Sequence, residues 1–234
     1  MDMLLKVLGG SLGVVFPAVF IFAIRKGISN SPFDDAKKSS YANVFTGMTA
    51  LWVLATWAAS VLGLFSYKPG DTIPRLLIPM FVPALIGWGM IASKDFRTVL
   101  DHTPLSVLAG VQTARLMGGA LLLVVYLGIL PKDFAQGAYG DIVTGALALV
   151  SSVLLSKGSG AGKVAFWAFT VAGMCDLLNV LRLLLVCYPI WNNAVPSSAP
   201  AGDFALVMLP ALAAPVALML HAYAVRNALV GVSK

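Results

Sequence analysis

Two charged residues stand inside long apolar stretches, and they are the positions in this sequence best placed to do chemistry. Arg115 lies within the run Leu105–Leu130, and Asp176 lies at a similar depth within Val164–Ile190. A charge near the middle of a bilayer costs about 2.5–3.5 kcal/mol on insertion scales, and an opposite charge beside it offsets that cost. The sequence therefore predicts an ion pair between Arg115 and Asp176.

Two amide side chains accompany this pair. Gln112 precedes Arg115 by about one helical turn, and Asn179 follows Asp176 by one turn. Residues at this spacing lie on the same face of a helix, so each helix would present a charge and an amide together. The four side chains predict a polar centre within the membrane.

A second pair of charges is expected nearer the outer surface. Arg182 follows Asp176 by six residues, which is about 9 Å along a helix, and its long side chain can extend toward the membrane surface. Asp141 is expected at the outer end of its own apolar run. It is therefore the nearest candidate partner for Arg182.

These charges allow two interpretations, and the sequence leaves both open. Charged side chains within a membrane often line the path of a solute or a proton. They can also act as a buried clip that fixes how helices pack. Two arginines and one deep aspartate favour an anion site or a clip over a proton relay. His221, near the end of the last apolar run, is expected to be a packing residue rather than a ligand.

The composition indicates that a membrane protein positions these residues. Of the 234 residues, 59% are hydrophobic and 11% are charged, whereas an ordinary soluble domain has roughly 25% charged residues. This excludes most soluble enzyme folds, a nucleic-acid-binding domain and a secreted disulfide scaffold. The net charge of +6 comes from basic residues spread along the whole chain, so it does not indicate a nucleic acid as a partner.

Seven apolar segments are long enough, or nearly so, to cross a membrane, which takes about 20 helical residues. No segment alternates in polarity as a strand of a membrane barrel would. The expected fold class is all-α: a seven-transmembrane helix bundle that forms a single domain over residues 1–234. The fifth segment is the weakest and crosses only if Asp141 lies at the membrane surface. The expected spans are Leu4–Ile24, Val44–Phe65, Leu76–Ser93, Leu105–Leu130, Tyr139–Ser156, Val164–Ile190 and Phe204–Val225.

Lys and Arg residues are unevenly distributed between the two sets of loops. The loops on one side of the seven spans carry ten of them, and the loops on the other side carry four. Basic residues accumulate on the cytoplasmic side of membrane proteins. The sequence therefore predicts an N-terminus outside the cytoplasm and a C-terminus inside it.

The second and third spans share features with the sixth and seventh. The tetrapeptide FTGM at 45–48 has a counterpart, VAGM, at 171–174, and in both halves a loop rich in Pro and Asp leads to a helix with two prolines near its start. This pattern fits a 3+1+3 arrangement with a parallel repeat, as in some transporters. Chance similarity accounts for so short a match equally well, and prolines are tolerated as kinks in membrane helices.

Signatures of catalysis and of cofactor binding are not found in the sequence. The two histidines, His102 and His221, are not placed to hold a haem, and no cluster of His, Cys or Asp has the spacing of a metal site. The glycine-rich loop 157–163 lacks the pattern of a phosphate-binding loop. The last span has no lysine for a retinal Schiff base. We therefore expect no catalytic residues, no metal and no cofactor.

The region 112–148 and the helix after it resemble a recurring pattern in small bacterial multi-pass membrane proteins of uncharacterised function. The pattern is R-x3-G beginning at Arg115, then LP-x2-FA, then GD-x3-G with Asp141 as its acid, and Asp176 matches an acidic position in the next helix. The resemblance covers about a third of the chain. It implies a multi-pass protein of the bacterial cytoplasmic (inner) membrane and singles out the same three charged residues. It implies no activity.

The leading functional hypothesis is a transporter or channel for a small solute. An anionic or zwitterionic solute would suit the surplus of positive charge expected at mid-depth. The alternative is a non-catalytic structural or accessory subunit that packs against other membrane proteins through small-residue grooves, and a membrane enzyme or ligand-binding sensor is a third possibility. The expected partners are the lipid bilayer, a small solute, and membrane proteins or further copies of the chain, with no nucleic acid. Under the leading hypothesis the binding residues are Arg115, Asp176, Asn179, Gln112, Arg182 and Asp141.

Overall fold

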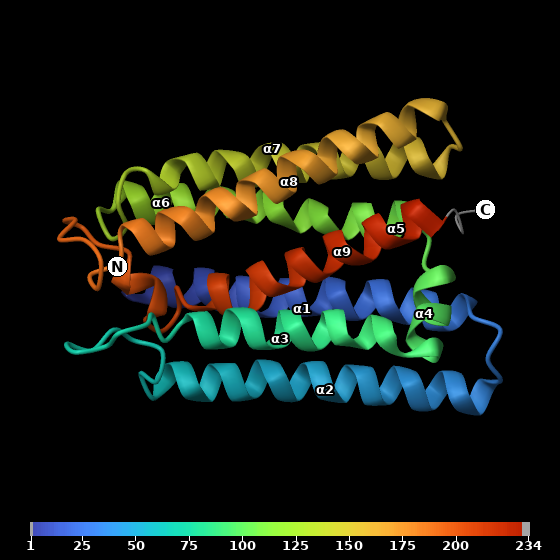
Figure 1. The fold of residues 1–234 in the computed structure, drawn as a ribbon, viewed down its shortest axis with the longest axis horizontal. Coiled ribbons are helices and arrows are strands. Elements are labelled where there is room, and N and C mark those ends of the chain that lie inside the picture. The colour runs from blue at the N-terminus through green and yellow to red at the C-terminus, as the bar shows by residue number, and fades with distance from the viewer. Residues whose placement is uncertain (1, 231–234) are drawn as a thin grey trace.

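The structure is a computed structural model and describes residues 2–230, in which every regular element is a helix (Figure 1). The long helices are α1 (Asp2–Asn30), α2 (Asp35–Val61), α7 (Phe134–Ser156), α8 (Gly160–Val186) and α9 (Ala214–Val230). The shorter elements are α3 (Leu77–Gly89), η1 (Met90–Ala92), α4 (Lys94–Asp101), α5 (Leu105–Gly110), η2 (Val111–Gly119), α6 (Ala120–Tyr126), η3 (Ala199–Gly202) and η4 (Leu209–Ala213).

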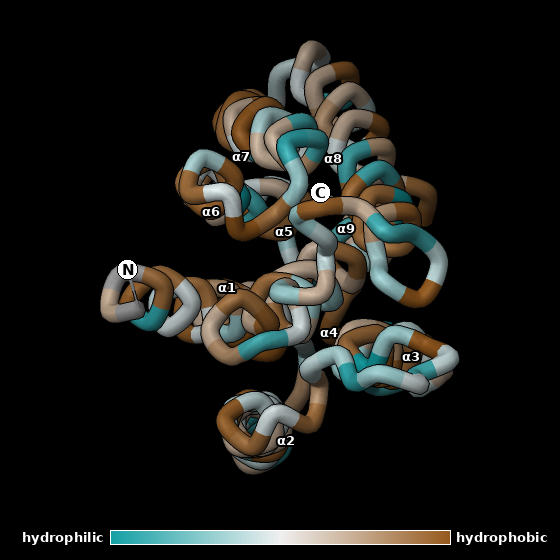
Figure 2. The backbone as a smooth tube through the Cα atoms, turned by 90° about the vertical axis from the view of Figure 1, so that its left-hand side faces the viewer, coloured by the Kyte–Doolittle hydropathy of each residue, from teal (hydrophilic) through white to brown (hydrophobic). Residues whose placement is uncertain are grey.

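The helices run back and forth along a common axis, so the start of α1 and the end of α9 lie at opposite ends of the bundle (Figure 1). Seen along that axis, α1 lies between α2 and the group formed by α5 to α8 (Figure 2). α1 packs against α2, α4, η2, η4 and α9, while α7 packs closely against both α8 and η2. α1 and the α7–α8 pair are therefore the elements that organise the rest.

Within residues 2–230, six segments are long and apolar enough to cross a membrane: α1, α2, the run α5–η2–α6, α7, α8 and the run η4–α9. The other expected span, Leu76–Ser93, corresponds to α3 and η1, which bend by 93° into α4. Ser93 caps α4 by accepting a hydrogen bond from the backbone N–H of Phe96 (3.4 Å), and Phe96 and Leu100 are buried. An all-helical, multi-pass membrane protein is confirmed, with six candidate spans among the described residues, or seven if the bent pair forms one span.

The boundaries of the fifth span differ from those expected. α7 begins at Phe134 rather than at Tyr139 and contains 23 residues. α7 continues directly from the preceding turn, in which the backbone N–H of Phe134 donates to the carbonyl oxygen of Pro131 (3.0 Å). Asp141 therefore lies two turns inside a long helix and not at its end.

Two other spans contain irregular turns that the sequence pattern does not reveal. The middle of the fourth span, η2, is a 3₁₀-helix of nine residues, which is long because runs beyond three or four residues are uncommon. The last span begins at Leu209 rather than at Phe204, and its first turn, which contains Pro210, is π-helical. Proline cannot donate its backbone nitrogen to the helix ladder, which accounts for an irregular turn there.

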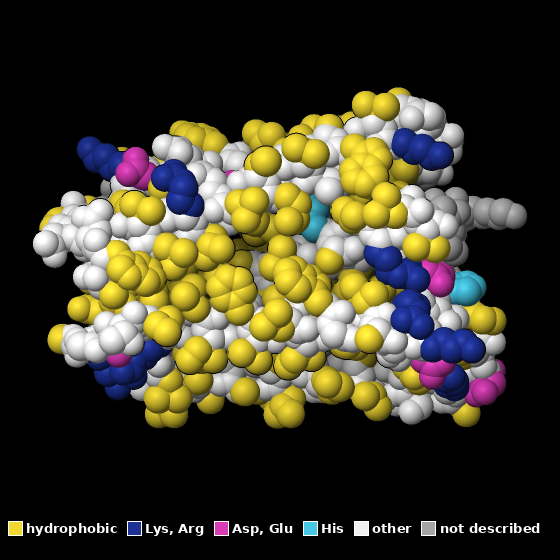
Figure 3. Space-filling view, in the orientation of Figure 1, with side chains coloured by type: hydrophobic (Ala, Val, Ile, Leu, Met, Phe, Trp, Pro, Cys, Tyr) yellow, Lys and Arg dark blue, Asp and Glu magenta, His cyan; other side chains and the backbone are white. Residues whose placement is uncertain are grey.

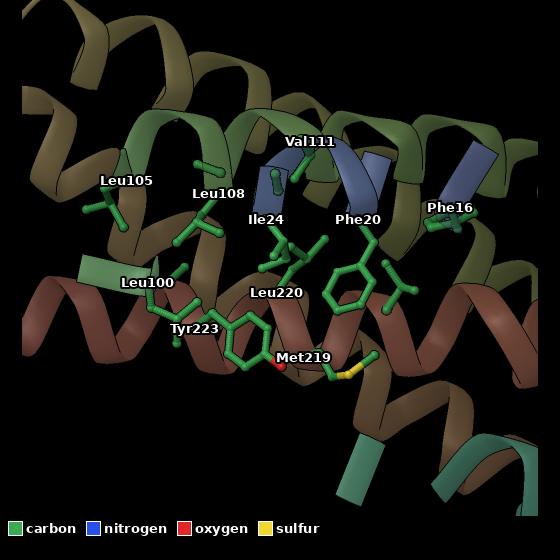
Figure 4. Packing of buried hydrophobic residues seen from close by; sticks show 14 of the residues in the cluster. Phe16, Phe20, Ile24, Leu100, Leu105, Leu108, Val111, Met219, Leu220 and Tyr223 are labelled. Atoms are coloured by element: carbon green, nitrogen blue, oxygen red, sulfur yellow. The ribbon is translucent and has the colours of Figure 1, made fainter. Parts of the chain in front are cut away.

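The main hydrophobic core lies where α1 faces α9, with α4 and α5 closing one end (Figure 4). The hydroxyl of Tyr223 donates to the carbonyl oxygen of Gly87 (2.7 Å), which ties α9 to α3. Burying each large apolar side chain contributes about 1.5–3 kcal/mol relative to exposure in water. The side chains labelled in Figure 4 are Phe16, Phe20, Ile24, Leu100, Leu105, Leu108, Val111, Met219, Leu220 and Tyr223.

The surface divides into an apolar middle and two charged ends. In Figure 3 the Lys, Arg and Asp side chains gather at both ends of the bundle, and hydrophobic side chains cover the band between them. At the end where α7 finishes, Lys37 pairs with Asp95 (2.9 Å). At the other end Arg75 pairs with Asp71 (2.6 Å), and its hydrogen bonds hold the pKa of Asp71 below the ordinary value. This distribution is typical of a protein whose ends meet water and whose middle meets lipid.

The direction of the termini and the internal repeat stay predictions. A protein that fluoresces only in the cytoplasm should be bright when fused after residue 234, because the positively charged loops are expected on that side. A phosphatase that is active only outside the cytoplasm should be active when inserted in the loop at Gly70, between α2 and α3. The reverse pattern at both positions would show that the topology is inverted.

Candidate functional site

A buried arginine lies at the centre of the bundle, and Arg115 is only 1% exposed. Its Nε donates to Oδ1 of Asp141 (2.7 Å), and its Nη2 donates to Oδ2 of Asp176 (2.5 Å). Its Nη1 faces the carbonyl oxygen of Gly173 (3.3 Å) and Nε2 of His221 (3.4 Å). One side chain thus joins η2, α7, α8 and α9. We call Arg115, Asp141 and Asp176 the charged triad.

The 3₁₀ geometry of η2 sets the position of Arg115. Residues three apart are stacked in such a helix, so Gln112, Arg115 and Gly118 form one row, and all three are buried. A Cβ atom on Gly118 would lie 2.3 Å from the Cβ of Asp141. The glycine therefore lets α7 come close enough for the short side chain of Asp141 to reach the guanidinium.

The contact between α7 and α8 positions the second carboxylate in the same way. A Cβ atom on Gly140 would lie 1.8 Å from Oδ1 of Asp176, so a glycine is needed where this carboxylate meets α7. Asp176 is 7% exposed. Two carboxylates thus share one guanidinium in a buried site, and the triad as a whole carries one excess negative charge.

His221 completes the surroundings of Arg115. Its ring is 1% exposed and stacks on Phe169 of α8 with centroids 4.8 Å apart. Because the guanidinium can only donate, Nε2 of His221 must accept, and the proton of the neutral ring then lies on Nδ1. Nδ1 has no hydrogen-bond partner among the residues that the structure describes.

A cavity of about 110 Å³ lies beside the triad, on the side of the N-terminal end of α7. The triad forms its polar wall, and the remaining lining is apolar and comes mainly from α1, α8, η4 and α9. The arrangement offers both signs of charge to a molecule whose other surfaces are apolar. Representative apolar lining residues are Leu12, Phe16, Phe134, Leu177, Leu209 and Pro210.

On the opposite side of the triad lie buried polar atoms that find no hydrogen-bond partner within residues 2–230. They are the amide group of Gln112, the hydroxyls of Thr144, Ser151 and Thr170, and Nδ1 of His221. Among all the residues that the structure describes, no group of three or more His, Cys or Asp side chains is placed to hold a metal ion.

The structure brings some of the expected site residues together and separates others. The expected ion pair between Arg115 and Asp176 is present. The expected pairing of Asp141 with Arg182 is wrong, because the longer α7 carries Asp141 inward to Arg115. Arg182 is exposed and donates instead to Asn179 (3.0 Å), one turn before it. These two described residues do not line the cavity.

Sequence reasoning missed three residues of the site: His221, Gly118 and Gly140. Gln112 was expected to contact the charges, but it is buried one turn from Arg115 without a bond to the triad. The glycines did carry a signal, since small residues within a span mark places where helices approach closely. His221 carried none, because only the packing of α9 against α8 brings it to Arg115.

The fold and the site together define a multi-pass, all-helical membrane protein with a charged centre buried between its helices. The sequence profile of one family matches residues 73–229, more than half of the chain, so the chain belongs to that family: DUF8737, a domain of unknown function. The matched region contains the triad and His221. No curated protein and no solved structure matches the chain. An uncharacterised family is thus confirmed, while the particular motif and the bacterial origin stay predictions.

The close approach at Gly140 gives a stability prediction. Gly140→Ala should displace the carboxylate of Asp176 from Arg115 and lower the free energy of unfolding by about 3–5 kcal/mol, the usual effect of leaving a buried charge without its partner. Thermal unfolding of the purified protein in mild detergent measures the effect.

Gly47→Ala in α2 is the matched control. Apart from the neighbouring backbone of α2 itself, no described atom lies within 4 Å of a Cβ atom there, and alanine favours a helix over glycine by up to about 1 kcal/mol. This variant should be as stable as the unaltered protein or slightly more so. Equal unfolding temperatures for the two variants would contradict the packing described at Gly140.

Proposed function

We propose that this chain is a membrane transporter for a small solute, with the charged triad as its binding site. The supporting observation is that the buried triad forms one wall of a cavity of about 110 Å³. Ion pairs that only join helices would be packed tightly, since protein interiors have few voids larger than a water molecule. An apolar cavity of about 150 Å³ holds a benzene-sized ligand, so this cavity suits a small solute.

The pairing within the triad changes the charge expected of the solute. A surplus of positive charge would have favoured an anion, but Arg115 is matched by two carboxylates, and Arg182 lies outside the cavity. A solute with an ammonium group would neutralise the second carboxylate. A zwitterion meets all three groups, with its ammonium at Asp141 or Asp176 and its carboxylate at Arg115. An apolar substituent would suit the rest of the lining.

The irregular turns beside the cavity support a transport function. The 3₁₀ segment η2 carries Arg115, and the π-helical turn η4 contributes Leu209 and Pro210 to the lining. Such turns often mark functional hinges, and transporters commonly build their sites from interrupted helices. Both interruptions contribute residues to the lining of the cavity.

Uptake by the purified protein in liposomes tests the proposal. A labelled α-amino acid with a small apolar side chain should enter faster than a monocarboxylate or an alkylamine of similar size. Asp176→Asn should slow this uptake about ten- to hundredfold, because a hydrogen bond to a charged group contributes about 1.5–3 kcal/mol.

Asp133→Asn is the control, since Asp133 is exposed just before α7 and does not line the cavity. It should transport at the unaltered rate. The proposal fails if none of the three solute classes enters, or if a folded Asp176→Asn protein transports as fast as the control.

A second candidate function is that of a non-catalytic subunit. It is favoured by an apolar cleft of about 490 Å³ between α2 and α3. Three apolar side chains that line this cleft, Leu51, Ile78 and Ile86, are each more than half exposed.

Native electrophoresis after mild-detergent extraction should show a single chain or a small homo-oligomer if the protein is a transporter. Migration in a larger complex of fixed composition would favour the subunit.

A further inference from the structure

A row of buried polar side chains leads away from the triad on the side opposite the cavity. We propose that this row is a hydrated proton path and that the triad exchanges one proton for the solute. The exchange rests on the proposed transport function, whereas the path rests on the contacts described below. We call the side chains of Gln112, Thr144, Ser151, Thr170 and His221 the polar row.

The members of the polar row are no more than 5% exposed, and each has a polar atom without a partner among residues 2–230. By contrast, Thr49 in α2 donates to the carbonyl of Phe45 (2.9 Å), one turn earlier in the same helix. Leaving a buried polar group unpaired costs about 1–3 kcal/mol. Five such groups in one region therefore call for water, which bonds to buried polar groups in many proteins.

The register of α7 against α8 places the first members of the row next to the triad. Gly140 faces Asp176, and one turn further along α7 Thr144 faces Gly173. A Cβ atom on Gly173 would lie 2.9 Å from Cγ2 of Thr144 and 2.4 Å from Nε2 of His221. Thr144 and His221 therefore meet at the same level, one turn along α7 from Gly140, and His221 also contacts Arg115.

The contact between η2 and α7 places Gln112 in the same row. Gly118 faces Asp141 at one end of this contact, and Gly110 faces Ser152 at the other, where a Cβ atom would lie 2.6 Å from the hydroxyl oxygen. Gln112 lies between these two points, on the stacked face of η2 that also carries Arg115. Its amide therefore falls between the levels of Thr144 and Ser152.

The polar row thus has successive levels that leave the triad in one direction. Thr144 and His221 come first, then Gln112 with Thr170 at a similar depth on α8, and finally Ser151. Ser151 lies about 15 Å along α7 from Asp141. This direction leads to the end of the bundle that holds the α7–α8 loop (Figure 1). The cavity lies on the other side of the triad, where Leu130, Phe134 and Leu206 line it. The triad therefore separates a polar side from an apolar side.

The charge of the triad indicates that the ion is a proton. Among the described groups in and around the triad, Arg115 is the only cation. It faces Asp141 from α7, Asp176 from α8 and the neutral ring of His221 from α9. The cavity walls from α1, α3 and η4 are apolar. One carboxylate is therefore uncompensated. A proton bound to the Asp141–Asp176 pair converts that carboxylate to a neutral carboxylic acid. The ammonium group of an arriving zwitterion replaces this proton as the partner of the carboxylate, and the proton leaves to water in the row. The carboxylate of the zwitterion pairs with Arg115, so the occupied site keeps one excess negative charge.

Cysteine labelling tests whether the row holds water. Thr144→Cys and Ser151→Cys should react with a small, charged thiosulfonate added on the side of the α7–α8 loop, since a thiol needs water to ionise and react. Val143→Cys and Val150→Cys are matched controls on the same helix, and these valines are 53% and 50% exposed to the lipid-facing side. We expect the row positions to react at least about tenfold faster in a chain whose native cysteines are replaced by alanine. Equal rates at row and control positions would overturn the path.

Infrared spectroscopy on the unaltered protein tests whether the triad holds a proton. At neutral pH and without a solute, one buried carboxylic acid should be visible, and its band should shift in deuterated water. Asp141→Asn and Asp176→Asn should each remove this band, because the remaining carboxylate then pairs fully with Arg115, whereas Asp133→Asn should keep it. A band that is missing in the unaltered protein, or unchanged in both triad variants, would show that no proton is shared.

Both measurements are made without a solute, so they separate the two proposals. Reactive row positions and a shared proton without any uptake would leave the proton path and remove the transport function. Uptake that depends on Asp176 with unreactive row positions would leave transport and remove the path.

Discussion

The sharing of one guanidinium by two carboxylates is the interaction on which the centre of this bundle depends. A charge in an apolar interior is tolerated only when its partners are close and well aligned. Aspartate has a short side chain, so Asp141 and Asp176 can reach Arg115 only if their helices approach closely. Gly118 and Gly140 make that approach possible. The ion pairs at the centre therefore require the tight packing of η2, α7 and α8, and neither can change without the other.

The triad also divides the interior into two unlike regions. Toward the N-terminal end of α7 the surroundings are apolar and leave a cavity, and toward the C-terminal end they are lined by hydroxyls, an amide and an imidazole. A protein that needed only stability would gain from replacing those polar groups with hydrocarbon, since unpaired buried polar atoms are costly. Their presence beside a net charge is what supports a role in moving a solute or an ion.

The sequence predicted the main charge of the site but not its neighbours. Arg115 and Asp176 could be paired because each stands out in an apolar run and because depth in a membrane follows from counting residues. Asp141 was assigned to the wrong arginine, since hydropathy cannot locate the start of α7 when polar residues such as Gln136 lie inside the helix. His221 lies in the site only because α9 packs against α8. Its position could not be read from local sequence.

For the fold, too, one part could be predicted from the sequence and another could not. The apolar runs gave the helices, but their irregular parts arise from packing and not from hydropathy. The bend between η1 and α4 is capped by Ser93, and the 3₁₀ segment has an ordinary composition that fits an α-helix equally well. Hydropathy measures how apolar a segment is, so it predicts whether the segment can cross a membrane but not its helical pitch.

The pitch of η2 has a mechanical consequence. A 3₁₀-helix rises about 2.0 Å per residue and turns about 120°, whereas an α-helix rises about 1.5 Å and turns about 100°. Rewinding its nine residues to α-helical pitch would shorten the segment by about 4.5 Å and rotate one end against the other by about half a turn. Arg115 sits in the middle of this segment. A change of pitch in this segment would therefore couple a shift along the helix axis to a rotation of Arg115 by about a quarter turn relative to either end.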